Sequence, residues 1–457
     1  FDDFHASRVL PGFQPDSKIR MLQQLKDMAE IVIAINANDI EKSKVRSDLG
    51  ITYDQDVTRL IDAFRNCGLL VSYVVITQYA QQPSAMAFRE KLTKLGIRTA
   101  LHYPIAGYPA NTSLIVSDEG YGKNEYLQTT RPLVVVTAPG PGSGKLAVCL
   151  SQLYQEQKRG IKAGYAKFET FPIWNLPLQH PVNLAYEAAT ADLNDVNMID
   201  PYHLEAYHTQ AVNYNRDVEA FPLLKTLLEK IQGSSIYRSP TDMGVNMAGY
   251  CIIDDQAAQD ASRNEIIRRY YRAQVDNRRA LGSQQEVNKI ELLMNQAGVD
   301  ANFRTCAVAA RIKADATGEP AVAIELADGR IVTGKTSKLL GASSAALLNA
   351  LKVLGGIDDS VELISASTIE PIQELKTGKL GSHNPRLHTD EALIALVISA
   401  SNNVASHNAI EQLPKLAYAE AHSTVILSEV DSGMFKKLKV NLTMDPVYQS
   451  KSLYHKK

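Results

Sequence analysis

The chain has 457 residues, of which 45% are hydrophobic and 21% charged, and its formal net charge is -2 at pH 7. This composition is typical of a globular protein with enough chain for two or three domains. The balanced charge and the lack of an apolar run of roughly 20 residues argue against nucleic acid or a membrane as partner.

The cysteines lie far apart and form no CxxC pair, which predicts reduced core residues of a cytoplasmic protein. They are Cys67, Cys149, Cys251 and Cys306. Because the chain begins with Phe1 rather than Met, its first residues give no basis for judging a targeting segment.

Short apolar, β-branched runs alternate with helical patterns over the first 137 residues. The runs predicted as strands are residues 31–35, 70–77, 98–103, 114–116 and 133–137. Such alternation is typical of βαβ units around a parallel sheet. We therefore expect an α/β fold whose N-terminal part is a doubly wound, mostly parallel sheet.

A locally basic segment, residues 41–50, follows the first predicted strand. One interpretation is a solvated surface loop, which is the usual role of such a charge run. The other is a lid that brings Lys42, Lys44 and Arg46 onto a phosphate.

A glycine-rich loop, residues 138–144, connects the strand at 133–137 to a helical pattern that ends at Gly160. Strand, glycine loop and helix form the layout that directs backbone N–H groups and a helix N-terminus at an anion. The residues predicted to bind a phosphorylated small molecule or nucleotide are Gly140, Gly142, Ser143, Gly144 and Lys145.

This loop departs from the Walker A pattern at two places. The pattern requires Gly where the chain has Pro139, and Ser or Thr where it has Leu146. The missing hydroxyl is the group that holds Mg²⁺ in that motif, so we do not expect conventional nucleotide hydrolysis here, although Mg²⁺ could accompany a bound nucleotide. The alternative is a tight strand-to-helix turn with Lys145 on the surface.

Two acidic segments leave alternatives open in the middle of the chain. Asp192, Asp195 and Asp200 could hold Mg²⁺, but helix caps and turns explain them better. Residues 251–255 resemble a Walker B strand end, and N-terminal acids of the following helix explain them equally well. Composition changes predict an α/β domain at 1–232, a helical region at 233–300 and a smaller α/β subdomain at 301–457.

The C-terminal part combines a predicted hairpin at Asp328-Gly329, further strands at 361–368 and 425–428, and a cluster of polar residues. In this cluster, residues 383–391, we predict His383 or His388 as the acid/base group, with Asp390 orienting it. Asn384 and Arg386 would bind an anionic group of the ligand. A helix cap explains the acids of this cluster but not the row of polar residues before them.

Four segments together resemble one uncharacterised bacterial family, a domain-of-unknown-function family. They are VVVTAPGPGSGK, KFETFPIWNLPLQHPVNLAYEAATADLNDVNMIDP, SPTDMGVNMAGYCIIDD and HNPRLHTDEALIALVISA. The resemblance implies an N-terminal α/β region, a helical region and an α/β C-terminal subdomain, but no established activity. Some members carry the label ATP-dependent zinc protease; the chain has neither HExxH nor HxxEH, so zinc is not expected.

These observations favour an enzyme that acts on a phosphorylated small molecule or nucleotide bound at residues 140–145. The alternative is a non-catalytic nucleotide- or metabolite-sensing or assembly protein. A homo-oligomer is the default expectation for a bacterial enzyme of this size.

Overall fold

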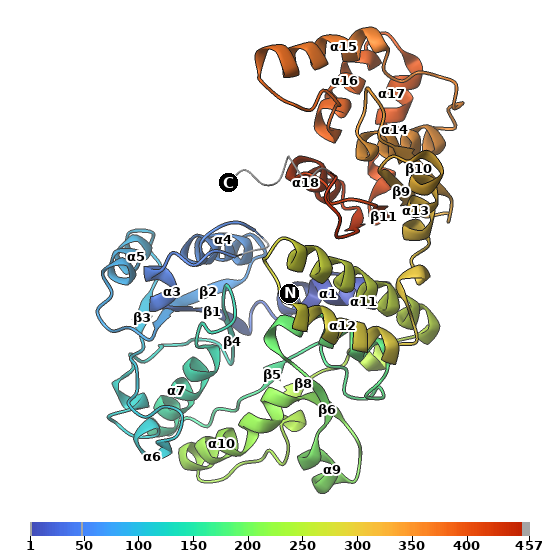
Figure 1. The fold of residues 1–457 in the computed structure, drawn as a ribbon. Coiled ribbons are helices and arrows are strands. Elements are labelled where there is room, and N and C mark those ends of the chain that lie inside the picture. Colours follow the sequence, from blue (N-terminus) through green and yellow to red (C-terminus); the bar gives the residue numbers. More distant parts are fainter. Residues whose placement is uncertain (1, 47–48, 450–457) are drawn as a thin grey trace. The chain divides into compact units, whose positions relative to one another are not determined.

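The computed structural model describes residues 2–46 and 49–449 and confirms a mixed α/β architecture (Figure 1). The chain forms two compact units, residues 1–178 with 195–255, and residues 179–194 with 256–457. The second unit therefore takes up a short segment from within the first. The predicted boundaries at residues 232 and 300 stay predictions.

The first unit is built on a four-stranded sheet in which every neighbouring pair is parallel, as the alternating pattern predicted. The strand order is β3-β2-β1-β4. The strands are β1 (Ala29–Asn36), β2 (Leu70–Thr77), β3 (Thr99–Leu101) and β4 (Leu133–Thr137).

Both faces of this sheet are covered, because side chains alternate between them along each strand. Ile31, Ile33 and Ile35 of β1 pack into a core with α4 and α5, whereas Val32 and Ala34 face Val148 of α7. These helices are α4 (Tyr53–Asn66), α5 (Pro83–Lys94) and α7 (Lys145–Lys158).

The other elements of the first unit are mostly short, apart from the 18-residue helix α10. They are α1 (Asp2–Val9), α2 (Ser17–Gln24), α3 (Ala37–Glu41), α6 (Thr112–Ile115), η1 (Tyr121–Lys123), β5 (Lys167–Phe168), β6 (Asn197–Ile199), α9 (Pro201–Tyr207), β7 (Val212–Tyr214), α10 (Asn215–Gln232), η3 (Thr241–Met243), β8 (Gly244–Val245) and η4 (Ala248–Cys251). The strand predicted at 114–116 is wrong. The Asn111 side chain caps α6 by accepting from the Leu114 N–H, which favours a helical turn here.

The second unit contains a mixed sheet of order β10-β9-β11-β12. Its antiparallel hairpin around Asp328-Gly329 is confirmed, and β11 pairs antiparallel with β9 and parallel with β12. The strands are β9 (Ala321–Glu325), β10 (Ile331–Lys335), β11 (Glu420–Ser423) and β12 (Asn441–Met444).

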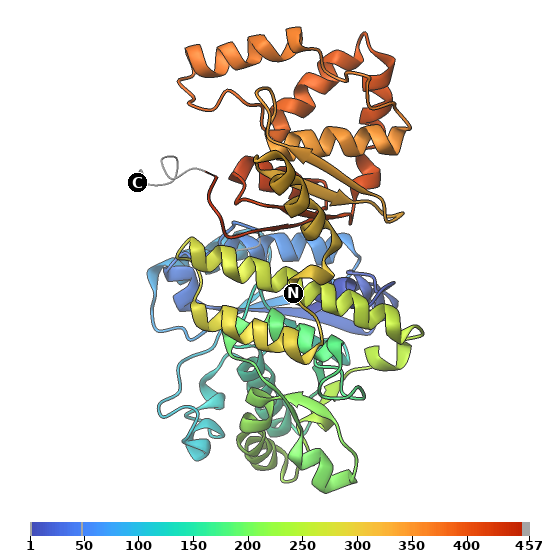
Figure 2. The ribbon, with the colours of Figure 1, turned by 45° about the vertical axis from the view of Figure 1, so that its right-hand side comes forward.

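Helices make up the rest of the second unit. They are α8 (Pro181–Ala189), η2 (Ala191–Leu193), α11 (Asp255–Arg278), α12 (Gln284–Gln296), η5 (Ala301–Phe303), α13 (Thr305–Thr317), α14 (Ala342–Gly355), α15 (Ala366–Glu374), a π-helical turn (Leu375–Lys379), α16 (Thr389–Ala400), α17 (Val404–Ile410), η7 (Leu413–Leu416) and α18 (Glu429–Lys437). Helices α11 and α12 run side by side in both ribbon views (Figure 2).

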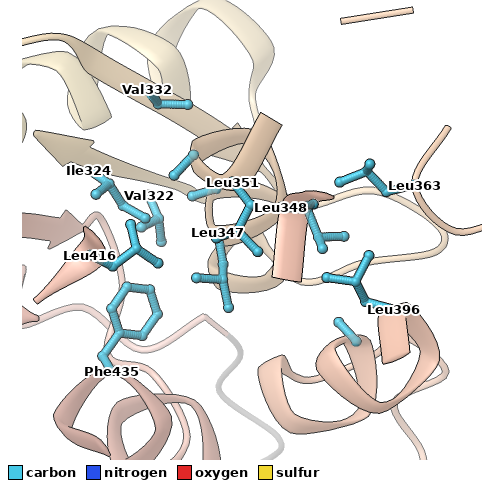
Figure 3. Packing of buried hydrophobic residues seen from close by; sticks show 14 of the residues in the cluster. Val322, Ile324, Val332, Leu347, Leu348, Leu351, Leu363, Leu396, Leu416 and Phe435 are labelled. Atoms are coloured by element: carbon cyan, nitrogen blue, oxygen red, sulfur yellow. The ribbon is translucent and has the colours of Figure 1, made fainter. Parts of the chain in front are cut away.

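The core of this unit gathers around α14. Leu347 and Leu351 of α14 meet Val322 and Ile324 of β9, and Phe435 of α18 packs into the same cluster (Figure 3). These side chains are fully buried. The core thus fixes α14 and α18 to the sheet, and α18 carries one half of the histidine site described below.

Two predicted strands of this unit are wrong. Residues 361–364 bury Leu363 and Ile364 without pairing, and α15 begins at Ala366. The strand predicted at 425–428 lies earlier in the chain, at β11. The polar residues of β11 are buried through hydrogen bonds, so the segment lacks the run of apolar residues by which a buried strand is recognised. His422 of β11, for example, contacts the Thr443 hydroxyl at 2.9 Å.

Candidate functional site

The glycine-rich loop leaves β4 at the point where the strand order of the first sheet reverses. The chain places β2 and β3 on one side of β1 and then returns to place β4 on the other side. In open parallel sheets, the carboxyl ends of the strands beside such a reversal border a crevice where ligands bind. Residues 138–144 therefore lie at the carboxyl edge of β1 and β4.

Hydrogen bonds from β1, from β2 and within the loop itself hold its carbonyl groups. The Asn36 amide, at the end of β1, donates to the Gly142 carbonyl at 3.3 Å. The Thr77 hydroxyl, at the end of β2, donates to the Ser143 carbonyl at 2.8 Å. The Ser143 hydroxyl is fully buried and donates to the Gly140 carbonyl at 2.9 Å, so this side chain supports the loop and does not face solvent.

The backbone N–H groups of the loop have no such partners. Within residues 2–46 and 49–449, no group accepts a hydrogen bond from the N–H of Gly142, Ser143 or Gly144. Gly142 and Gly144 adopt φ of +76° and +87°, and Gly144 is the N-cap of α7. Consecutive N–H groups around left-handed glycines form a concave nest that suits an anion, and the helix N-terminus adds partial positive charge.

Close packing explains two of the glycines. A Cβ on Gly140 would lie 2.3 Å from the Tyr53 hydroxyl, and a Cβ on Gly144 would lie 2.9 Å from the Thr77 hydroxyl. Neither position has space for a side chain, and at Gly144 the positive φ favours glycine as well.

Lys145 is the first residue of α7 and is exposed, as the alternative of a tight strand-to-helix turn predicted. Leu146 occupies the place of the Walker A hydroxyl and is partly buried against the core of α7 and α10. The loop therefore resembles a phosphate-binding turn in its backbone but offers no hydroxyl for a metal ion at this position.

The three cations of the predicted lid, residues 41–50, have different surroundings. Arg46 contacts the buried carboxylate of Asp56 at 2.7 Å, which commits it to the fold. Lys44 lies 3.3 Å from Asp39 and 4.9 Å from the centre of the Tyr53 ring. Lys42 is exposed. The tip of the predicted lid, residues 47 and 48, lies outside the described residues.

His388, predicted as an acid/base group, is the N-cap residue of α16 in the second unit. Its Nδ1 lies 2.8 Å from a carboxylate oxygen of Asp431, on α18. Because a carboxylate only accepts, Nδ1 carries the proton, and Nε2 is left to exchange a proton. The hydrogen bond to Asp431 raises the pKa of His388 above its ordinary value, although partial burial opposes the increase.

Asp431 is also held by its neighbours. The Ser428 hydroxyl donates to it at 2.8 Å, and the Thr389 N–H donates at 2.9 Å. Burial acts to raise the pKa of Asp431. The hydrogen bonds, led by that from His388, act to lower it and together outweigh burial, so the pKa lies below its ordinary value. The carboxylate therefore stays charged and fixes the imidazole in one orientation.

A buried lysine completes the surroundings of His388. Lys376 donates to Glu391 at 2.6 Å and to the Arg386 carbonyl at 2.7 Å. Glu391 in turn accepts from the backbone N–H of His388 at 2.8 Å. The backbone of His388 is thus fixed from one side and its ring from the other.

The remaining predicted residues of this stretch lie apart from the imidazole. Asp390 accepts from the N–H of Glu391, so the orienting role predicted for it belongs to Asp431. The Asn384 side chain accepts from the Arg386 N–H, and Arg386 donates to the Ser337 carbonyl at 2.8 Å. His383 is exposed. The structure therefore brings together His388 and Asp431, but not the two histidines.

Asp431 and Ser428 were missed by sequence reasoning. Ser428 is the N-cap of α18, where its hydroxyl accepts from the Asp431 N–H at 3.1 Å. This S-x-x-D spacing is a recognisable helix start, so the local structure was predictable. Nothing local in the sequence pairs Asp431 with a histidine 43 residues away.

The two acidic segments considered as cation sites are explained by local structure. Asp200 caps α9 and accepts from the Thr241 hydroxyl at 2.6 Å, and Asp255 opens α11. Among the described residues, no three His, Cys, Asp or Glu side chains group as a metal site. Nor does any helix in that part of the chain have the length and hydropathy to cross a membrane.

The fold and these sites define a class: a two-unit α/β protein with a parallel sheet whose glycine loop lies at a reversal of strand order. The chain belongs to the family described as Domain of unknown function DUF1846. The model of its N-terminal domain matches residues 1–298, and that of its C-terminal domain matches residues 302–454. The family resemblance is thereby confirmed.

Similar proteins carry the name UPF0371 protein. One from Streptococcus thermophilus (strain ATCC BAA-491 / LMD-9) is 59% identical over 455 residues, covering 100% of this chain and 92% of the relative. One from Corynebacterium glutamicum (strain R) is 58% identical over 458 residues with the same coverage. A third, from Streptococcus pneumoniae (strain JJA), is 59% identical over 455 residues, again with 100% and 92% coverage.

Proposed function

We propose that the chain is an enzyme that binds the phosphate group of a small molecule or nucleotide at the loop of residues 140–145. The observation that supports this most is that the N–H groups of Gly142, Ser143 and Gly144 have no acceptor among the described residues. They lie at the reversal of strand order, in front of a 14-residue helix, with Lys145 beside them. An anion there would receive backbone hydrogen bonds, the helix dipole and a cation together.

In the second unit, considered by itself, His388 is the group suited to acid/base chemistry. Asp431 holds Nδ1 and keeps the opposite nitrogen, Nε2, available for a proton. The hydrogen bond to Asp431 raises the pKa of this imidazole above its ordinary value, which favours the protonated form that a general acid needs. Arg386, whose Nε is held by the Ser337 carbonyl, would pair with a further anionic group.

Ligand binding is tested by thermal shift with nucleotides, sugar phosphates and Mg²⁺ on the wild type and on Lys145→Ala. At 100 times its dissociation constant a ligand adds roughly 2.7 kcal/mol, which is visible as a higher Tm. We expect a phosphorylated compound to stabilise the wild type and Lys162→Ala, an exposed control, but not Lys145→Ala. If no phosphorylated compound shifts the wild type, the loop does not bind phosphate.

The same ligand then separates an enzyme from a sensor or assembly protein. In an enzyme, the wild type turns over the compound that it binds, and His388→Ala tests whether this histidine takes part in the turnover, because the substitution leaves the loop untouched. In a sensor, the wild type itself shows binding without turnover. His383→Ala is the matched control, since this exposed histidine lies apart from Asp431.

A further inference from the structure

Tyr53 connects the glycine loop to a second cation. Its hydroxyl lies 2.3 Å from where a Cβ on Gly140 would be, so the phenol end touches the loop. The ammonium group of Lys44 lies 4.9 Å from the centre of the same ring. One aromatic side chain thus separates Lys44 from the loop, and Lys145 stands at the loop's other end.

The position of Lys44 is fixed through its backbone. Its N–H donates to the Asp39 carbonyl and its carbonyl accepts from the Tyr53 N–H, both at 2.9 Å. Val45 and Thr52 pair as an antiparallel bridge beyond it. These contacts fix where the backbone of Lys44 lies beside Tyr53, and the cation reaches its binding position through its side chain alone.

The side chain of Lys44 keeps capacity for a ligand. Its closest charged partner is Asp39, at 3.3 Å, and the lysine side chain is 43% exposed. An ammonium group has three donors, so contact with one carboxylate leaves others for a second acceptor. Arg46, by contrast, is bound to a fully buried carboxylate and is not available.

An unpaired polar atom at the same edge of the sheet independently indicates a ligand. The parallel register sets His102 beside Thr77, the residue whose hydroxyl holds the loop. His102 is 4% exposed, and its Nδ1 has no hydrogen-bond partner among the residues that the structure describes. The His102 Nε2 contacts the Glu125 carbonyl and so carries the ring proton, which leaves Nδ1 as an acceptor that an ordered water or a protonated phosphate oxygen can satisfy.

We propose that the ligand of the glycine loop carries two neighbouring phosphate groups: the N–H groups of the loop and Lys145 bind one, and Lys44 binds the other. This inference rests on the proposed phosphate site and specifies its ligand class, a diphosphate rather than a monophosphate. Two cations beside one nest suit the greater charge of a diphosphate, and each charge-assisted contact strengthens binding.

The probes are inorganic phosphate and inorganic pyrophosphate, titrated calorimetrically at equal ionic strength against the full chain. We expect pyrophosphate to bind the wild type about tenfold or more tightly than phosphate, which is the strength of one charge-assisted hydrogen bond. Lys44→Ala removes this preference and leaves phosphate affinity unchanged, whereas Lys44→Arg retains it. Lys145→Ala weakens both probes, and Lys42→Ala, an exposed control in the same segment, weakens neither.

Two failures are distinguishable. If neither probe binds the wild type, the phosphate site itself is wrong and the diphosphate inference falls with it. If both probes bind and depend on Lys145, but Lys44→Ala keeps the preference for pyrophosphate, the loop binds phosphate and only the role of Lys44 is overturned.

Discussion

The imidazole of His388 and the carboxylate of Asp431 lie 2.8 Å apart although 43 residues separate them in the chain. Two helix starts produce this contact, since His388 precedes α16 and Asp431 lies in the first turn of α18. Both helices are packed into the core around α14, so the pair is part of the rigid framework of the second unit.

The first prediction concerns the titration of this pair. We expect NMR to show a pKa of His388 above 6.5 in the wild type and a lower value in Asp431→Asn, where the carboxylate is replaced by a neutral amide. His383, an exposed histidine of the same stretch, serves as the internal control. An unchanged His388 pKa in Asp431→Asn would contradict the contact.

The same pair makes stability depend on pH. The raised pKa of His388 contributes stability that is complete below its unfolded value of about 6.5 and is lost as pH rises through the folded pKa. The lowered pKa of Asp431 contributes stability above about pH 3.9 that is lost as pH falls through the folded value. The pair therefore stabilises most between roughly pH 4 and 6.5, and the loss above this window should be absent in His388→Gln.

The second prediction tests the packing of the glycine loop. Gly140→Ala should destabilise the first unit by about 1–3 kcal/mol, because the new methyl group would overlap the Tyr53 hydroxyl. Urea unfolding followed by the fluorescence of Trp174, the one tryptophan of the chain, reports on this unit. Gly164→Ala is the control, since nothing lies within 4 Å of its Cβ position. Equal stability of the two variants would show that Tyr53 does not contact the loop.

The third prediction concerns Arg304, which is 2% exposed in the second unit. It donates to Glu420 at 2.5 Å, to the Thr443 hydroxyl at 2.8 Å and to two backbone carbonyls of the sheet. Arg304→Met should cost about 3–5 kcal/mol, because it breaks these four hydrogen bonds and removes the buried partner of the Glu420 carboxylate, which keeps only Arg268 as a cation.

Hydrogen exchange of peptides from β11 and β12 in increasing urea measures this loss locally. Arg330→Met is the control: its arginine pairs with Asp328 on the surface, where ion pairs contribute little. A similar loss of protection in both variants would mean that the Arg304 contacts do not hold the sheet together.

Local signals explain how much of the fold was predictable. The β-branched run at β4, the glycines after it and the helical spacing of α7 are all properties of adjacent residues, and each was predicted correctly. The strand at β11 was missed because His422 is fully buried through the Thr443 hydroxyl and so breaks the apolar pattern. Burial of a polar residue depends on a partner that its own segment does not contain.

The candidate site was less predictable for the same reason. Sequence proximity suggested Asp390 as the partner of His388, but the Asp390 carboxylate accepts from a helix N–H, and Asp431 comes from another helix. In the lid, Lys44 and Arg46 look equivalent in the sequence. Only the buried Asp56 beside Arg46 and the Tyr53 ring beside Lys44 separate their roles.

The last prediction concerns His102, at the carboxyl end of β3. Burial lowers its pKa from 6.5 to about 4, against an opposing hydrogen bond to the Glu125 carbonyl. Between these values the folded state binds fewer protons than the unfolded state, so stability falls as pH falls from about 6.5 to about 4. The difference corresponds to about 3 kcal/mol.

Urea unfolding followed by Trp174 fluorescence at about pH 7 and pH 4.5 should show most of this loss in the wild type and its absence in His102→Gln. His208→Asn, a change at an exposed histidine of the same unit, should keep the wild-type pH dependence. If His102→Gln also keeps it, His102 is not buried in its neutral form, and its unpaired Nδ1 no longer supports a ligand at this edge of the sheet.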